Sequence, residues 1–414
     1  MEYSAVLDKF LRYVKIDTQS SEESSDKVPS TEKQRDLAKL LYEELTKFGA
    51  GDVRYDAEHC YVYAVIPSNM DESQKKIPAV GFIAHIDTSP AVSGKNVNPR
   101  VIENYDGNDI ILNREKNIVT RVSDFPMLKN CVGKRLVVTD GSTLLGGDDK
   151  AGVAEIMTMA EHLLKHPEIK HGKVCIGFTP DEEVGNGVAH FDIKGFGADC
   201  AYTVDGGELG DMSYECFNAA GAVLTVTGKS VHPGYAKNIM RNAVKLAYEF
   251  ISALPDECPE NTEGYEGFYH VDSIRGTVEK ASAEYIIRDH DRAKFEQRKA
   301  VFVNTAEKLN EKYGAGTFHV DMKDSYCNMR EMIEKEMYIV DNAVEAMKRA
   351  GVEPRISAIR GGTDGARLSF EGLLCPNICT GSEGHHGRNE FACVEDMEKI
   401  VEIMLNLIEI YTHF

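Results

Sequence analysis

The chain has 414 residues, enough for two domains with buried cores, and its 42% hydrophobic content includes no apolar run long enough for a membrane span. Its 67 acidic and 47 basic residues give a formal net charge of −20, which argues against nucleic acid or an anionic membrane surface as a partner. Ten cysteines form no CxxC pair and the N-terminus has no signal-peptide pattern, so we expect reduced thiols and a cytoplasmic protein.

The first half of the chain alternates between helical and strand patterns. Apolar residues with helical spacing and short runs rich in β-branched residues follow one another. This alternation predicts an α/β fold with a sheet flanked by helices. The expected helices are 4–16, 31–48 and 151–166, and the expected strands are 61–66, 79–84, 174–179 and 201–204.

The segment AHIDTSP follows the second expected strand and contains His85 and Asp87. Side chains two residues apart in an extended strand point to the same face. An aspartate there can orient an imidazole that binds a metal ion. Taken alone, the pair is more typical of a structural histidine whose hydrogen bonds are satisfied, so its meaning depends on the segments that follow.

Two acidic segments come next along the chain. In LLGGDDKAG, Asp148 and Asp149 precede an expected helix, where they could cap the helix or, more specifically, bridge two cations. In FTPDEEVG, Glu182 and Glu183 follow the strand 174–179. One glutamate could bind metal while the other moves protons as a general base, although a solvated acidic turn is the simpler reading.

Two further segments complete a set of potential ligands. Asp205 ends the strand in AYTVDGG, and His385 and His386 lie in the glycine-rich segment GSEGHHGRNEF. Histidine and carboxylate side chains at the ends of several strands form a mixed nitrogen and oxygen donor set. Such a set suits zinc, with cobalt or manganese as substitutes, better than calcium or magnesium.

Beyond residue 215 the pattern changes. A strand at 219–228, a helix at 242–254, a strand at 283–288 and a long helix at 292–313 come before two final helices. Those final helices are expected at 335–350 and 396–412, on either side of the segment IRGGTDGARLSF and the histidine-rich loop.

Segments along the whole chain resemble the aminotripeptidase branch of the M20 family of two-zinc metallopeptidases. They include GFIAHIDTSP, TLLGGDDKAGVAEIMT, FTPDEEVG, AYTVDGG, TEGYEGFYH and IRGGTDGARLSF. The resemblance implies a mixed sheet flanked by helices, with a smaller inserted α+β lid domain. It places the catalytic domain at 1–216 and 326–414 and the lid at 217–325, through which members of the superfamily can form homodimers.

The resemblance also implies which residues bind metal. Asp148 would bridge two zinc ions, His85 and Asp205 would complete one coordination shell, and Glu183 and His386 would complete the other. Asp87 would orient His85, and Glu182 would be the general base. The family pattern further implies a cis peptide between Asp148 and Asp149.

The implied reaction is hydrolysis of the N-terminal peptide bond of tripeptides by a water molecule activated between two zinc ions. His232 would stabilise the oxyanion, and closure of the lid would bring it and Arg288 over the substrate. Arg288 and Arg360 are candidates to hold the substrate carboxylate. Asn218 and Asn242 are weaker contact candidates.

Three alternatives stay open from the sequence. Here TGSEGHHGRNEF stands where the family usually has TGGYNYHGKHEF, so His385 could replace His386 as a ligand. The same centre could serve a dipeptidase, a carboxypeptidase or an acyl-amino-acid deacylase. The chain could also belong to a different functional class, as a non-catalytic relative that only binds peptides.

Overall fold

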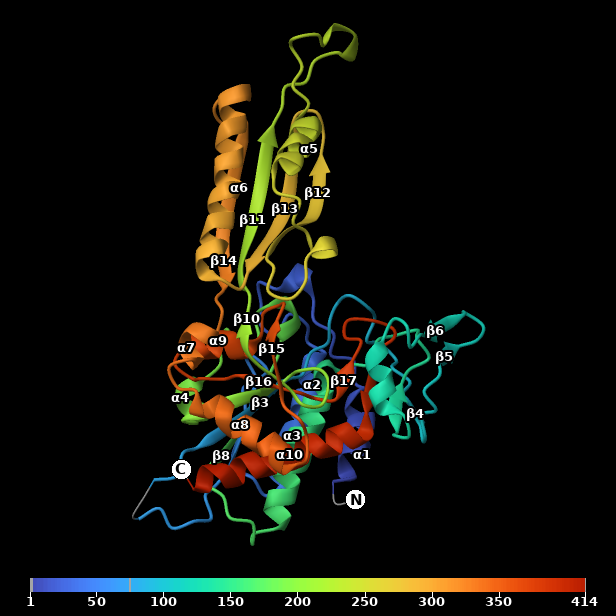
Figure 1. The fold of residues 1–414 in the computed structure, drawn as a ribbon, viewed down its shortest axis with the longest axis vertical. Coiled ribbons are helices and arrows are strands. Elements are labelled where there is room, and N and C mark those ends of the chain that lie inside the picture. Colours follow the sequence, from blue (N-terminus) through green and yellow to red (C-terminus); the bar gives the residue numbers. More distant parts are fainter. Residues whose placement is uncertain (1–2, 74–75, 414) are drawn as a thin grey trace. The chain divides into compact units, whose positions relative to one another are not determined.

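The computed structural model describes residues 3–73 and 76–413, and it divides the chain into two compact units. The first unit comprises Met1–Tyr214, Glu331–Ser357 and Thr363–Phe414, and the second comprises Glu215–Arg330 and Ala358–Gly362. Figure 1 shows the chain as a ribbon and labels many of the helices and strands.

A mixed eight-stranded sheet forms the centre of the first unit. The strands β8, β3, β9 and β16 pair in parallel, β1 and β2 pair antiparallel to their neighbours, and β10 pairs antiparallel with β16. The inner strands β3, β8 and β9 are buried along their whole length, which explains their nearly continuous apolar sequences. In spatial order the strands are β1 (Gly51–Tyr55), β2 (Val62–Ile66), β8 (Val174–Thr179), β3 (Val80–His85), β9 (Cys200–Val204), β16 (Asn377–Ile378), β10 (Asp211–Cys216) and β15 (Arg355–Ile359).

Helices pack against this sheet and against one another. Helix α3 contacts β3 and β9 and is itself contacted by α1, α2 and α10, while α8 packs on α10. The start of α3 lies directly against the end of β9, since a Cβ at Gly152 would be only 1.9 Å from the carbonyl oxygen of Val204. The helices are α1 (Ala5–Tyr13), α2 (Gln34–Phe48), α3 (Gly147–Lys165), α4 (Ile193–Phe196), α7 (Arg330–Ile333), α8 (Tyr338–Arg349), α9 (Asp364–Phe370) and α10 (Val394–Thr412).

A small antiparallel sheet stands beside the main one in the first unit. Its strand order is β17 (Ser382–Glu383), β18 (Phe391–Cys393), β7 (Leu136–Val138) and β4 (Arg100–Ile102). Strands β17 and β18 form a hairpin whose loop, 384–390, carries the two adjacent histidines. A ribbon of β5 (Ile110–Asn113) and β6 (Ile118–Thr120) and the 3-10 helix η2 (Pro126–Cys131) lie between β4 and β7 in the chain.

The second unit is a four-stranded antiparallel sheet with two long helices, α5 (Ala243–Ala253) and α6 (Arg292–Tyr313). Alternate residues of β13 are buried, as expected for a sheet with one covered face. The apolar sides of both helices pack against it and form a core with Leu224, Phe250 and Phe302. The strand order is β12 (Phe268–Gly276), β13 (Lys280–Asp289), β11 (Asn218–Thr227) and β14 (Phe318–Tyr326).

The predicted α/β fold class is confirmed, and most expected elements occur within a few residues of their predicted bounds. Helix α6 occupies the predicted residues, whereas α3 begins four residues earlier than expected, at Gly147. The polar segment 20–27 includes a short 3-10 helix, η1 (Glu22–Ser24). Within the described ranges, no helix combines the length and the apolar character required to cross a lipid bilayer.

Candidate metal centre

Polar side chains converge where three parallel strands of the first unit end. His85 is the last residue of β3, Asp205 follows β9, and Glu182 and Glu183 lie in the 3-10 turn η3 (Glu182–Val184) after β8. The carboxyl ends of parallel strands meet at one edge of a sheet, which is where such folds place their functional groups. Asp148 joins these side chains from the start of α3.

His85 turns one ring nitrogen toward the acidic cluster and the other toward Asp87. Its Nε2 lies 2.9 Å from Asp148 Oδ1 and 3.9 Å from Asp205 Oδ1. Its Nδ1 lies 3.1 Å from the carbonyl oxygen of Asp87 and 3.3 Å from that residue's Oδ1. Burial lowers the pKa of His85, but hydrogen bonds with Asp148 and Asp87 outweigh it and raise the pKa well above the usual value. Asp87 thus fixes the ring so that Nε2 faces the cluster.

Asp148 lies between two groups of donors, one on each of its carboxylate oxygens. Oδ1 faces His85, while Oδ2 lies 3.3 Å from His386 Nε2. His386 Nε2 is also 2.8 Å from Glu183 Oε2. One group therefore contains His85 and Asp205, the other contains Glu183 and His386, and the Asp148 carboxylate spans the two.

The charges of the cluster are strongly coupled. Burial raises the pKa of Asp148, but the neighbouring histidines outweigh it and hold the pKa well below the usual range. Burial raises the pKa of Glu183 to about 7 and that of Asp205 to about 6. Hydrogen bonds to Asp148 and Glu183 raise the pKa of His386 to about 11. Bound protons and positively charged histidines thus compensate the negative charge of the carboxylates. Metal cations could compensate the same charge.

The peptide between Asp148 and Asp149 is cis, which confirms the expectation from the family pattern. Asp149 is fully buried and accepts the backbone N–H of His85 at 3.1 Å on its Oδ2. Its carboxylate also lies close enough to His85 and Asp205 to share a cation with them. Asp149 therefore holds the end of β3 beside the cluster.

The two glutamates of η3 are held by their backbone and differ in their side-chain contacts. Asp87 accepts the N–H of Glu182 at 3.1 Å and that of Glu183 at 3.3 Å, one on each carboxylate oxygen. The preceding residue, Asp181, has a left-handed φ of 54° and accepts hydrogen bonds from Ser30. Glu183 contacts His386, whereas burial raises the pKa of Glu182 well above the usual value. A carboxylate with a raised pKa is suited to accept and return a proton.

His385 and His386 both approach Asp148, and their contacts differ. His385 Nδ1 lies 3.6 Å from Asp148 Oδ2, and its Nε2 lies 3.0 Å from Ser382 Oγ. His386, with a left-handed φ of 58°, reaches both Asp148 and Glu183 through Nε2. The structure therefore gives His386 the contacts expected of the ligand and gives His385 a neighbouring position.

Two buried carboxylates that the sequence analysis did not single out support this cluster. Glu390 accepts the backbone N–H groups of Leu145 and Gly146 at 2.7 Å and that of Asp148 at 2.9 Å. Asp364 accepts a hydrogen bond of 2.7 Å from Thr179 Oγ1 at the end of β8, and burial raises its pKa to about 7. Both act on the backbone or on strand ends, so no local pattern in the sequence identifies them.

Two of the predicted substrate contacts in the second unit have structural roles. Asn218 is fully buried, donates to the carbonyl oxygens of Asp289 and His290 and accepts the N–H of Asn328. Asn242 is the N-cap of α5. These contacts engage the side-chain amide of Asn218 and the Oδ1 of Asn242 with the backbone, and the reading of both asparagines as substrate contacts stays a prediction.

The two arginines of the second unit that were predicted to bind the substrate carboxylate differ in their hydrogen bonds. Arg360 donates to the carbonyl oxygens of Gly264 and Glu266 and to Thr262, so its guanidinium holds the 262–266 loop. Arg288 donates one bond to the carbonyl oxygen of Arg360. Its Nε is buried and has no hydrogen-bond partner among the described residues. Arg288 is therefore the better candidate to bind a carboxylate.

His232 precedes the short 3-10 helix η4 (Pro233–Tyr235) in the second unit. Its ring is exposed and accepts the N–H of Gly234 at 3.1 Å through Nδ1. This bond leaves Nε2 as the nitrogen that could carry a proton and donate to a ligand.

Comparison with known proteins places the chain in a family. Residues 214–317 match the model described as the peptidase dimerisation domain. Peptidase T of Desulfitobacterium hafniense (strain Y51) is 55% identical over 409 residues, covering 99% of this chain and 98% of that protein. Peptidase T of Alkaliphilus oremlandii is 54% identical, and the match covers 98% of this chain and 99% of that protein.

Solved structures share the fold. A tripeptidase from Staphylococcus aureus matches with a TM-score of 0.78 at 21% sequence identity, and the match covers 100% of this chain and 99% of the tripeptidase chain. Aminopeptidase PepT from Bacillus cereus matches with a TM-score of 0.75 at 22% identity, over 99% of each chain. The family expected from the sequence motifs is confirmed: the chain belongs to the peptidase T family of M20 peptidases.

Proposed function

We propose that this protein is an aminotripeptidase that hydrolyses the N-terminal peptide bond of tripeptides with the aid of two zinc ions. The observation that carries the proposal is the position of Asp148, whose two carboxylate oxygens face two different groups of nitrogen and oxygen donors. Two-metal hydrolases need a carboxylate in this position, between two cations roughly 4 Å apart.

The donor set fits such a centre. Glu183 Oε1 is buried and has no hydrogen-bond partner among the described residues, as expected of an oxygen that a cation would coordinate. We assign His85 and Asp205 to one zinc ion, Glu183 and His386 to the other, and Asp148 to both. The donors are imidazoles and carboxylates, for which cobalt or manganese could substitute.

The chain's own residues supply the proton transfers. Bound zinc would lower the pKa of a water molecule and polarise the scissile carbonyl. Glu182 takes the proton from the attacking water and delivers it to the leaving amine, while Asp87 Oδ1 contacts both the backbone N–H of Glu182 and Nδ1 of His85 and keeps the two residues in place. His232 would donate from Nε2 to the oxyanion.

The second unit supplies the remaining contacts in this proposal. Arg288 would hold the C-terminal carboxylate of the substrate through its guanidinium, because a planar pair of donors matches a carboxylate. We further propose that residues 217–325 act as a lid and mediate a homodimer, in line with the dimerisation-domain match, and that the protein works in the cytoplasm with its ten cysteines reduced.

A panel of substrates tests the proposed activity. The zinc-loaded protein is expected to hydrolyse a free tripeptide at its N-terminal bond, and to act much more slowly on a dipeptide, an N-acylated amino acid and the same tripeptide with a C-terminal amide. The amide lacks the charge that Arg288 would bind, so its KM should rise by about 100-fold or more. Product identification by mass spectrometry measures this, and preferential turnover of the N-acylated compound would instead indicate a deacylase.

Separate alanine substitutions distinguish the two adjacent histidines. His386→Ala should weaken binding of one zinc ion by more than about 100-fold, because it removes a direct ligand. His385→Ala should have a smaller effect, because its ring also contacts Ser382. Zinc titration with a competing chelator measures both. An equal loss in the two variants, or a larger loss for His385→Ala, would reassign the ligand.

A further inference from the structure

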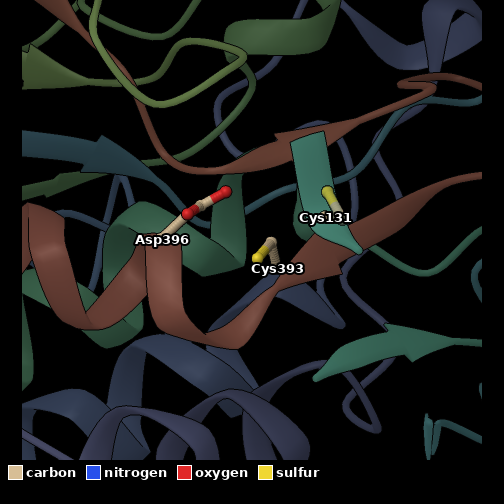
Figure 2. A group of neighbouring side chains, drawn as sticks. All are labelled: Cys131, Cys393 and Asp396. Carbon is tan, nitrogen blue, oxygen red and sulfur yellow. The ribbon is translucent and has the colours of Figure 1, made fainter. Parts of the chain in front are cut away.

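Three side chains that can bind a soft cation lie together in the first unit and share no residue with the candidate metal centre. They are Cys131, the last residue of η2, Cys393, the last residue of β18, and Asp396 in the first turn of α10 (Figure 2). One potential ligand atom from each lies within 4.8 Å of the other two. The three residues are only 5%, 1% and 7% exposed.

The backbone fixes these three positions. Cys393 pairs with Leu136 where β18 joins β7, and the N–H of Lys134 bonds to the carbonyl oxygen of Cys131 at 3.0 Å. Cys393 is the N-cap residue of α10 and Asp396 lies in the first turn of that helix, so both belong to the start of α10. The cluster therefore does not depend on flexible surface side chains.

The separation of the ligand atoms suits a tetrahedral ion. Zinc binds thiolate sulfur at about 2.3 Å and carboxylate oxygen at about 2.0 to 2.2 Å, so its ligand atoms stand roughly 3 to 4 Å apart. The upper limit of 4.8 Å in the structure is close to this range, and small side-chain rotations would close the difference. Thiolates select zinc and similar soft cations over calcium and magnesium.

The surroundings provide a fourth position and a balancing charge. All three side chains line a cavity of about 440 Å³, which has room for a water molecule as the fourth ligand. Lys134 Nζ lies 2.6 Å from Asp396 Oδ1. A divalent cation bound by two thiolates and one carboxylate keeps a single excess negative charge, and the Lys134 ammonium would balance it.

Both cysteines belong to an apolar cluster that includes Leu128 and Phe391. The hydrogen bond with Cys131, together with burial, raises the pKa of Cys393. A cation would displace the thiol protons, so that each bound ion releases two protons to solvent while two metal–sulfur bonds form.

We propose that Cys131, Cys393 and Asp396 form an additional, thiolate-containing site for zinc or another soft divalent cation, which links η2 to the start of α10. This site does not depend on the proposed peptidase function. The candidate metal centre has only nitrogen and oxygen donors, so a spectroscopic signal from sulfur separates the two sites.

Cobalt(II) titration of the metal-free, reduced full chain tests the site. A thiolate-to-cobalt charge-transfer band should appear in the near ultraviolet for the wild type. The band should be lost in Cys131→Ser and in Cys393→Ser, and zinc binding by these variants should fall by one ion per chain. Cys175→Ser, which changes a buried cysteine in β8, is the matched control and should keep both the band and the ion.

Two results would overturn the proposal. One is a wild-type protein that shows no such band with excess cobalt, including a protein in which Cys131 and Cys393 are recovered as a disulfide that excludes the metal. The other is a band that survives when both cysteines are replaced by serine. Tripeptide turnover measured on the same samples reports on the candidate metal centre alone, so a failure of the proposed function is seen separately.

Discussion

Replacing Glu182 by glutamine is expected to lower kcat for tripeptide hydrolysis by about a thousandfold while the protein still binds its metal ions. A positioned general base contributes typically 10² to 10⁴ in rate, and glutamine cannot accept the proton of the attacking water. Glu183, not Glu182, contacts His386, so the ligand set stays complete. Steady-state kinetics and metal analysis on the same sample measure the two quantities.

Glu43→Gln is the matched control for this experiment, because it makes the same chemical change on the exposed side of α2. It should leave kcat and metal content unchanged. A Glu182→Gln enzyme with wild-type turnover would assign the proton transfers to another residue. A protein that binds tripeptides without any turnover, even before substitution, would support the reading as a non-catalytic peptide binder.

Replacing Asp148 by asparagine is expected to weaken binding of both metal ions together, each by more than about 100-fold, and to abolish hydrolysis at ordinary zinc concentrations. The two carboxylate oxygens face two different donor groups, and an amide offers only one oxygen in their place. Asp205→Asn should weaken mainly the ion that His85 binds. Isothermal titration of the metal-free variants with zinc compares the two patterns.

Asp26→Asn serves as the control, since Asp26 is exposed and far from these donors in the sequence. Loss of only one ion in Asp148→Asn would contradict the bridging role. Circular dichroism of the metal-free variants should match the wild type, because the Asp148 side chain contacts only histidines of the cluster in the described structure.

The convergence of the residues of the candidate metal centre could be predicted because the pattern around them is local. Each follows a short apolar strand or opens a helix, and parallel strands bring their carboxyl ends to one edge of a sheet whatever the sequence distance between them. His85, Asp148, Glu183 and Asp205 meet in the structure for this reason. The family pattern assigned His386 as the ligand, and in the structure it is this ring that reaches Glu183, while the role of ligand stays a prediction.

Other features depend on contacts that no local pattern reveals. The strands of the small sheet have only two or three residues each, too few for an apolar alternation to be recognised. Arg360 has the residue type of a carboxylate ligand, yet its donors are used by the carbonyl groups of a loop nearly a hundred residues earlier. The roles of Asp364 and Glu390 likewise rest on partners that are distant in the sequence.

The hydrogen bonds that Glu390 accepts have a consequence for biosynthesis. Its carboxylate holds backbone groups that are 242 to 245 residues earlier in the chain, and His386 belongs to the same late segment. A ribosome therefore synthesises the ends of β3, β8 and β9 and the start of α3 before either side chain exists. A nascent chain that has not yet reached residue 386 lacks both, so the cluster cannot be completed at that stage of synthesis.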